Sequence, residues 1–218
     1  MKIIARIRTG FPEKFSVPRQ SGLVETEGTI VFEPEYRNDD ALRGIEQYSH
    51  LWLIWDFSEN HREDWSPTVR PPKLGGNKRV GVFATRSPFR PNPIGLSSVR
   101  LVEVKKTEEG TVLVVSGADL VDNTPIYDIK PYLPYTDCHT DAGGGFAEEN
   151  LQTSEVVYDE EVAKDIPEDK LLEICNILSL DPRPGYHREE GREYNMTYDG
   201  LNITFIPENK KIRICRIV

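Results

Sequence analysis

The stretch LSSVRLVEVKKTEEGTVLVVSGADL, residues 96–120, is typical of two β-strands joined by a tight turn at 108–110. Other runs in the first 140 residues are rich in β-branched or aromatic side chains and also predict strands: 3–9, 28–34, 50–57, 80–85 and 124–133. A short helix is expected at 38–48, capped by Asp39 or Asp40. Many short strands at such intervals favour a closed β-barrel over a parallel sheet.

The last third of the chain has a different pattern. Residues 141–150 are expected to be a linker between a first domain at 1–140 and a small second domain at 151–218. Within the second domain, 167–180 predicts a helix that begins at Pro167. Its expected apolar face consists of Leu171, Leu172, Ile174, Cys175 and Leu178. A three-stranded meander should follow at 192–218. The sequence therefore predicts a mainly β fold, with a barrel and a small α+β C-terminal domain.

The composition is that of a globular protein, with 38% hydrophobic and 29% charged residues. No apolar run approaches the ~20 residues needed to cross a bilayer, and the N-terminus has too little apolar content for a signal peptide. Three widely spaced cysteines predict reduced thiols in a cytoplasmic protein. The four histidines lack metal-ligand spacing, so we expect no metal.

Charge is distributed unevenly along a chain whose formal net charge is −9. No acidic residue lies between Asp64 and Glu103, a gap that contains seven basic residues: Arg70, Lys73, Lys78, Arg79, Arg86, Arg90 and Arg100. Because the local field rather than the total charge steers a polyanion, this region indicates a nucleic-acid contact. A solvated basic loop is the other interpretation.

Loops rich in proline flank the strand expected at 80–85. SPFRPNPIG (87–95) cannot be a central strand, because proline fixes φ and lacks a backbone donor. Such a stiff basic loop suits an anionic ligand or a carboxylate, although a loop held by arginine–carbonyl bonds fits the composition equally well. WSPTVRPPKLGGNKRVG (65–81) has the same character. DLVDNTPIYDIKPYLPYTD (119–137) suits either turn formation or ligand binding.

Several long segments carry a resemblance to a known family: KFSVPRQSGLV, RGIEQYSHLWLIW, PTVRPPKLGGNKRVGVFATRSPFRPNPIGLS, LVDNTPIYDIKPYLPYTD and DPRPGYH. Together they resemble the TsaA-like (YaeB/TrmO) family almost continuously over 14–137. The resemblance implies an S-adenosylmethionine-dependent methyltransferase built on a β-barrel. It also implies a tRNA substrate, methylated at the exocyclic amine of N(6)-threonylcarbamoyladenosine beside the anticodon, and a homodimer.

Matching the family's motifs to this sequence implies a set of cofactor-binding residues: Pro18, Arg19, Gln20, Ser58, Glu59, Arg86, Leu96, Asp119, Leu120, Val121 and Asp122. At the position of Ser58 and Glu59, many members of the family carry a pair that resembles His-Gln instead. Arginines can hold the carboxylate of the methionine moiety, carboxylates and backbone groups can bind the ribose, amino group and adenine, and Leu96 and Val121 can form apolar walls.

Asp128 is our candidate to accept the proton of the substrate amine, with Lys130 and Tyr135 positioning the modified base. The other interpretation of Asp128 and Lys130 is a structural ion pair. The residues expected to bind RNA phosphates are Arg70, Lys73, Lys78, Arg79 and Arg90. Two alternative functions remain at this point: an S-adenosylmethionine-binding regulatory module, and a methyltransferase for another RNA or a small molecule.

Overall fold

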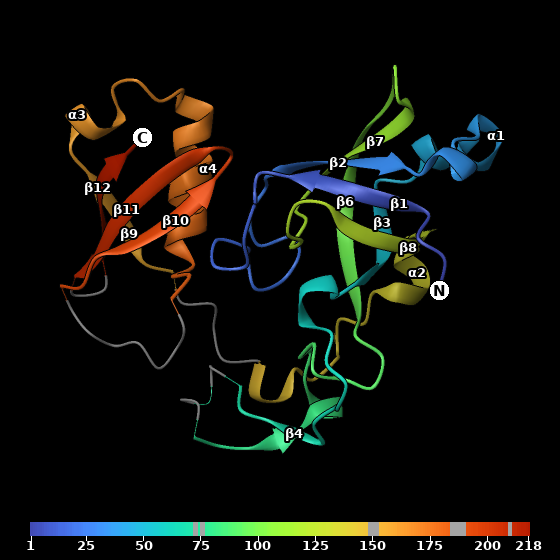
Figure 1. Cartoon of the computed structure of the whole chain (residues 1–218), viewed down its shortest axis with the longest axis horizontal. Helices are drawn as coiled ribbons and strands as arrows, with labels where there is room; N and C mark the ends of the chain where they lie inside the picture. Colours follow the sequence, from blue (N-terminus) through green and yellow to red (C-terminus); the bar gives the residue numbers. More distant parts are fainter. Residues whose placement is uncertain (72–73, 75–76, 148–152, 184–190, 209–210) are drawn as a thin grey trace.

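A closed six-stranded antiparallel barrel forms the first part of the computed structural model (Figure 1). The structure describes residues 1–218 except 72–73, 75–76, 148–152, 184–190 and 209–210. The barrel strands are β1 (Ala5–Thr9), β2 (Glu27–Phe32), β3 (His50–Asp56), β6 (Ile94–Thr107), β7 (Gly110–Ser116) and β8 (Thr124–Pro131). They are hydrogen-bonded in the order β1-β2-β7-β6-β3-β8, and β8 pairs with β1 to close the barrel. The predicted barrel is confirmed.

Alternation along the strands builds the barrel core. On β3, Leu51, Leu53 and Trp55 are buried while Trp52 and Ile54 are partly exposed. The same period of two on the other strands places further apolar side chains inside: Ala5, Ile7, Ile30, Val99, Leu113, Val115 and Ile126. Burying one face of each strand specifies the register, because a slip by one residue would turn this apolar set outward.

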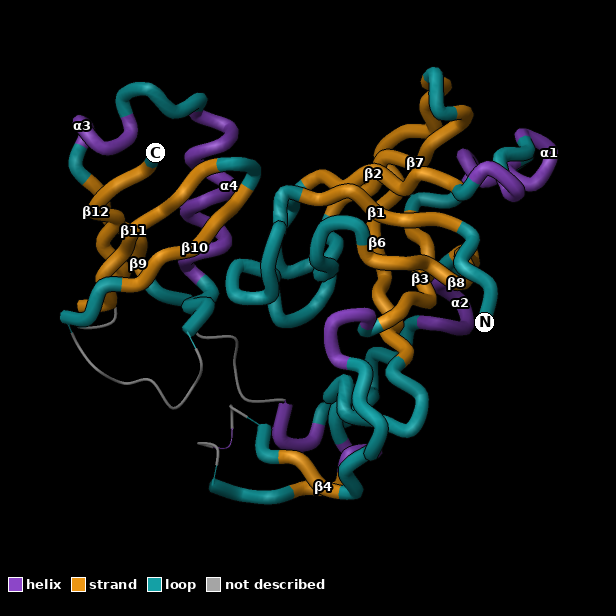
Figure 2. Tube along the Cα trace, in the orientation of Figure 1, coloured by secondary structure: helices purple, strands orange, loops and turns teal. Residues whose placement is uncertain are grey.

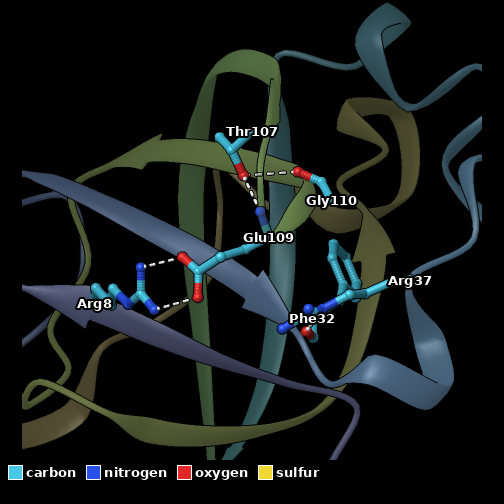
Figure 3. Close-up of polar contacts among 6 residues, drawn as sticks. All are labelled: Arg8, Phe32, Arg37, Thr107, Glu109 and Gly110. Atoms are coloured by element: carbon cyan, nitrogen blue, oxygen red, sulfur yellow. Dashed lines mark hydrogen bonds and ion pairs between the residues drawn. The ribbon is translucent and has the colours of Figure 1, made fainter.

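The β6–β7 hairpin has the turn that the sequence predicts at 108–110 (Figure 3). The Thr107 hydroxyl donates to the Gly110 carbonyl at 2.8 Å and accepts from the Glu109 N–H at 3.2 Å. Gly110 has φ 96°, which favours glycine. Two hydrogen bonds of 2.6 and 2.8 Å join Arg8 to the Glu109 carboxylate, so the hairpin is also tied to β1.

The structure corrects two of the expected elements. The predicted strand at 80–85 is only a two-residue strand, β5 (Val80–Gly81), which pairs with β4 (Thr68–Val69) and is followed by the 3-10 helix η5 (Val82–Ala84). Figure 2 shows that β4 lies in a loop-rich region extending away from the barrel.

The helix expected at 38–48 is also shorter than predicted. It consists of α1 (Asp39–Leu42) and the 3-10 helix η2 (Ile45–Gln47), and Gly44 with φ 89° separates them. The cap is neither Asp39 nor Asp40. Instead, the Asn38 side chain accepts from the Asp40 N–H at 3.0 Å. Further short helices among the described residues before 148 are η1 (Pro34–Tyr36), η3 (Ser58–Asn60), α2 (Pro134–Asp137) and η6 (Gly145–Ala147).

The C-terminal part is a four-stranded sheet covered by a helix. Its elements are β9 (Glu155–Tyr158), α3 (Glu160–Ala163), α4 (Glu168–Ser179), β10 (Tyr194–Tyr198), β11 (Leu201–Glu208) and β12 (Lys211–Ile217). The meander β10–β11–β12 matches the prediction, but β9 was not predicted and pairs with β12 in parallel. Among the described residues, no helix has both the length and the apolar character needed to cross a bilayer.

A linking segment, residues 11–24 between β1 and β2, packs against the C-terminal part. Phe11 and Val24 are buried in the same apolar cluster as α4 and the C-terminal sheet. The ring centroids of Phe11 and Tyr198 are 5.0 Å apart, and the Ser16 hydroxyl donates to the Thr197 carbonyl at 2.9 Å. Because the linking segment also carries residues 18–20, the C-terminal part supports one wall of the site described below.

Candidate functional site

A cavity of about 960 Å³ lies against the barrel, beside β3 and the start of β6. Its walls come from the linking segment, β3, the start of β6, the loops at 57–60 and 85–90, the segment 119–124 and the Pro182–Arg183 pair of the C-terminal part. Nine of the expected cofactor residues line it: Pro18, Arg19, Gln20, Ser58, Glu59, Arg86, Leu96, Asp119 and Val121. Segments far apart in the sequence therefore meet at one site.

Two of the expected cofactor residues do not line this cavity. Leu120 is completely buried in the barrel core. Asp122 is exposed, and its carboxylate accepts from the Thr9 N–H at 2.9 Å while its own N–H donates to the Phe11 carbonyl at 2.7 Å. Asp122 thus holds the start of the linking segment, and the buried Leu120 anchors the segment that carries Asp119 in the barrel core.

The arginines of the site are held by different partners. Arg19 donates to the carbonyls of Asp181 (3.1 Å) and Arg183 (2.8 Å), which connects the linking segment to the C-terminal part. Arg86 donates to the side-chain oxygen of Gln20. Arg90 donates to the carbonyls of Val82 and Thr85 at 3.2 and 2.7 Å. Arg90 therefore stiffens the proline-rich loop through arginine–carbonyl bonds, while Arg86 keeps an exposed guanidinium at the cavity.

Asp119 is a partly buried carboxylate in the wall of the cavity, and its pKa is shifted. Burial raises the pKa of this carboxyl, although a hydrogen bond from the Ser97 hydroxyl and backbone N–H groups of Asp119 and Ser21 oppose the shift. The Trp55 indole in turn donates to the Ser97 hydroxyl at 2.9 Å. This chain of bonds fixes an acceptor that suits a hydroxyl or amine of a ligand.

The floor of the cavity is aromatic. Trp55 lies against Gly95, where an added Cβ would come within 2.1 Å of the indole ring. The ring centroids of Trp55 and Phe57 are 4.3 Å apart. Only glycine at position 95 lets the indole lie flat, so Gly95 shapes an apolar surface on which a planar ligand group can pack.

Sequence reasoning missed three polar residues beside the site. Asp56 lines the cavity, is buried, and lies 2.8 Å from the Nε2 of His61. Burial and a hydrogen bond with Asp56 raise the pKa of Tyr127. Tyr127 lies where the β3–β8 register shifts between Ile54 and Trp55, and such a bulge re-aims a side chain. A bulge of this kind has no sequence pattern that could have revealed the contact.

The residues expected to be catalytic lie outside the cavity lining. Asp128 and Lys130 form an ion pair of 2.9 Å, and Asp128 also accepts from the Ile129 N–H at 2.9 Å. This contact fits the other interpretation of the sequence, in which Asp128 and Lys130 are a structural ion pair. Tyr135 is 86% exposed. A catalytic role for the three residues stays a prediction.

Of the residues expected to bind RNA, Arg70, Lys78 and Arg79 are exposed in the loop-rich region around β4 and β5. Arg79 donates to the Thr68 hydroxyl at 3.1 Å. Lys73 lies outside the described residues. Arg90 is partly buried and lines the cavity, as described above.

The fold and the cavity define a β-barrel protein with a site for a mid-sized ligand that has both apolar and charged groups, and not a nucleotide-binding parallel sheet. The profile of the tRNA-methyltransferase O N-terminal domain matches residues 6–138, and that of the TrmO C-terminal domain matches 152–218. The chain belongs to the tRNA-methyltransferase O family, as the resemblance implied.

Relatives and solved structures agree with this assignment. The tRNA (adenine(37)-N6)-methyltransferase of Escherichia coli K12 is 43% identical over 92% of this chain and 89% of its own length. A "Probable S-adenosyl-L-methionine-binding protein" of Pyrococcus abyssi is 40% identical over 72% of this chain and 80% of its own length. The crystal structure of TrmO from Pseudomonas aeruginosa superposes with a TM-score of 0.78 at 34% identity, covering 100% of this chain and 96% of the other.

Proposed function

We propose that this chain transfers a methyl group from S-adenosylmethionine to the exocyclic amine of N(6)-threonylcarbamoyladenosine at position 37 of tRNA. One observation carries the proposal. Nine residues that the family resemblance selected from separate segments line a single cavity, in a chain whose family includes tRNA (adenine(37)-N6)-methyltransferases.

The chemistry of the cavity fits this cofactor. Arg86 offers a guanidinium for a carboxylate, Asp119 is a fixed acceptor for a hydroxyl or amine, and Trp55 with Gly95 gives a flat apolar floor for a purine. Arg19 contributes through the position of the linking segment, since its guanidinium is bonded to carbonyls of the C-terminal part. When bound, S-adenosylmethionine would supply an electrophilic methyl group on its sulfonium.

The chain's own residues then have three tasks. They hold donor and acceptor in line, an effect worth up to about 7–11 kcal/mol in favourable systems. They accept the proton that leaves the amine as the new N–C bond forms, which we assign to Asp128 with Lys130 and Tyr135 as its neighbours. They limit the access of water to the reacting atoms through the apolar side chains that line the cavity. In register, Asp128 lies opposite Ile54, which lies opposite the cavity residue Leu96.

Methyl transfer to defined tRNA tests the proposed function. The chain is incubated with S-adenosylmethionine and tRNA that carries or lacks the threonylcarbamoyl group, and the nucleosides are analysed by mass spectrometry. We expect a methylated product only from the modified tRNA. Binding of S-adenosylmethionine by calorimetry without transfer to either tRNA would instead support a regulatory binding module.

Replacing Asp128 by Asn tests the assigned proton acceptor. Loss of a general base lowers turnover by roughly 10²- to 10⁴-fold, and the cofactor affinity should stay unchanged. The matched control is Asp40→Asn, which removes an exposed ion pair with Arg43 far from the cavity. Turnover by Asp128→Asn equal to that of the wild type would leave Asp128 and Lys130 as a structural pair.

We further propose that Arg70, Lys78 and Arg79 bind tRNA phosphates. Substituting all three with Ala should weaken binding and flatten the dependence of log K on log salt by about 0.7 per lost contact. Lys2, Lys105 and Lys106, three exposed lysines elsewhere on the barrel, give a control with the same change in net charge. Equal salt slopes for the two triple variants in filter-binding titrations would argue against the patch.

We also propose that the chain acts as a homodimer in the cytoplasm, where its tRNA substrate would be found. All three cysteines, Cys138, Cys175 and Cys215, are free, which fits a reducing compartment. Light scattering of the purified chain tests the dimer.

A further inference from the structure

Trp52 is a partly exposed tryptophan on the outer face of the barrel, and it lines the cavity. Its indole N–H donates to the Asp137 carboxylate at 2.8 Å, and the same oxygen accepts from the Leu133 N–H at 2.9 Å. Tyr132 packs beside it with the ring centroids 5.5 Å apart. The plane of the indole is therefore fixed before any ligand arrives.

The strand register places Trp52 in an apolar strip on the outer face of the barrel, which consists of Trp52, Ile54 and Leu96. Ile54 is two residues along β3 on the same face, and Leu96 on β6 lies opposite Ile54. Leu96 is 56% exposed and also lines the cavity. Apolar side chains that project from the outside of a barrel into an open cavity indicate that something planar or apolar covers them.

Of the strip residues, Leu96 is assigned to the cofactor, whereas Trp52 is not and has no role so far. The cofactor residues with polar groups, among them Gln20, Arg86 and Asp119, belong to the linking segment, the proline-rich loop and the segment after β7. Trp52 belongs to the middle of β3, opposite Lys130 of β8. The cavity of about 960 Å³ is near the upper end of the range of roughly 300–1,000 Å³ for ligand pockets, so it has room for a second planar group beside a cofactor.

We propose that Trp52 stacks on the acceptor purine, and that Asp137 is the positioning residue that sets the angle of the indole. This inference rests on the proposed function, because the occupant must reach the cofactor within the same cavity. Hydrogen bonds from Leu133 and Trp52 keep the pKa of Asp137 below its usual range, so the carboxylate stays charged at neutral pH. A flat aromatic face suits a base presented by a single-stranded loop.

The test compares Trp52→Leu, Trp52→Phe and Asp137→Ala by steady-state kinetics on an anticodon stem-loop RNA that carries the modified base. Loss of a base–aromatic stack should lower kcat/KM for the RNA by about 10- to 100-fold in Trp52→Leu. Trp52→Phe keeps an aromatic face and should retain activity within a few-fold. Asp137→Ala should raise the KM for RNA and leave kcat unchanged.

Calorimetry with S-adenosylmethionine on each variant distinguishes loss of RNA stacking from misfolding. In a correctly folded variant the dissociation constant of S-adenosylmethionine should not change. Tyr48→Leu is the matched control, because Tyr48 is an exposed aromatic residue of the barrel that does not line the cavity. A kcat/KM for RNA equal to that of the wild type in Trp52→Leu would overturn the inference. So would a change of Trp52→Leu from dimer to monomer, because the strip would then be covered by a second copy of the chain. A wild-type chain that methylates no RNA overturns the proposed function itself.

Discussion

Single residues decide the shape of the cavity, and Gly95 is the clearest case. The indole of Trp55 occupies the space where any side chain at position 95 would begin. Trp55 is in turn bonded to Ser97, and Ser97 is bonded to Asp119. A shift of the Trp55 ring would therefore displace Ser97 and, through it, the Asp119 acceptor.

Gly95→Ala should both destabilise the chain and weaken cofactor binding. The new methyl group overpacks the floor, which costs about 1–3 kcal/mol, and the displaced indole disturbs Asp119. Urea denaturation and calorimetry with S-adenosylmethionine measure the two effects. Gly81→Ala is the matched control, since nothing lies within 4 Å of the Cβ it would add. Equal cofactor affinity in both variants would contradict the role given to Gly95.

Among the elements, α4 shows how a helix is oriented by its buried face. The apolar periodicity predicts both Leu172 and Leu178 for the inner side. The structure buries Leu178 completely, together with Ile174 and Ile177, but leaves Leu172 61% exposed, so the prediction for Leu172 is wrong. The buried face of α4 therefore includes fewer residues than the apolar residues of the helix predict.

Leu178→Ala and Leu172→Ala form a matched pair on this helix. Leu178→Ala creates a cavity in the C-terminal core and should lower the free energy of unfolding by about 2–5 kcal/mol. Leu172→Ala removes an exposed side chain and should change it by about 0.5 kcal/mol or less. Chemical denaturation followed by circular dichroism measures both, and similar losses in the two variants would refute this orientation of α4.

Elements with a regular side-chain period could be predicted from sequence, and others could not. The barrel strands, the β6–β7 turn and α4 follow from alternation, turn residues and helical spacing. The strand β9 is short and pairs in parallel with a strand more than fifty residues later, a contact that no local pattern reveals. Gly44 ends α1 early because its positive φ breaks the helix.

The cavity was predictable only in part, for a related reason. The resemblance pointed to residues 18–20, Arg86 and Asp119, and the structure brings them together. Trp52 lies in a segment that carries the family resemblance, but the resemblance assigned it no role, and Tyr127 reaches Asp56 through a bulge. The burial of Leu120 and the hydrogen bond between Asp122 and Thr9 depend on contacts with residues far away in the sequence, which residue type alone does not encode.

At the scale of the whole molecule, the linking segment couples the barrel to the C-terminal part. Phe11 is buried between them, and Gly10 approaches the Tyr198 ring so closely that an added Cβ would lie 2.7 Å from it. The Asp199 N–H donates to the Gly10 carbonyl at 2.7 Å. Apolar packing and backbone bonds across this contact should make the chain unfold as one unit.

Phe11→Ala should separate the unfolding of the two parts. Removing the ring costs about 3–5 kcal/mol, and the loss falls on the contact that joins them, so calorimetry should show two thermal transitions in place of one. Phe32→Ala, in the barrel core, is the control and should lower a single transition. One cooperative transition in Phe11→Ala would show that the coupling lies elsewhere.

The position of β12 between β11 and β9 has a consequence for synthesis on the ribosome. Translation produces β9 long before Lys211–Ile217, so β9 has no strand partner in its sheet until that later segment has emerged. Until then the C-terminal sheet is incomplete, and the linking segment packs against an unfinished C-terminal part. The barrel strands can pair cotranslationally, whereas the sheet that packs beside the linking segment is complete only once β12 has paired with β11 and β9.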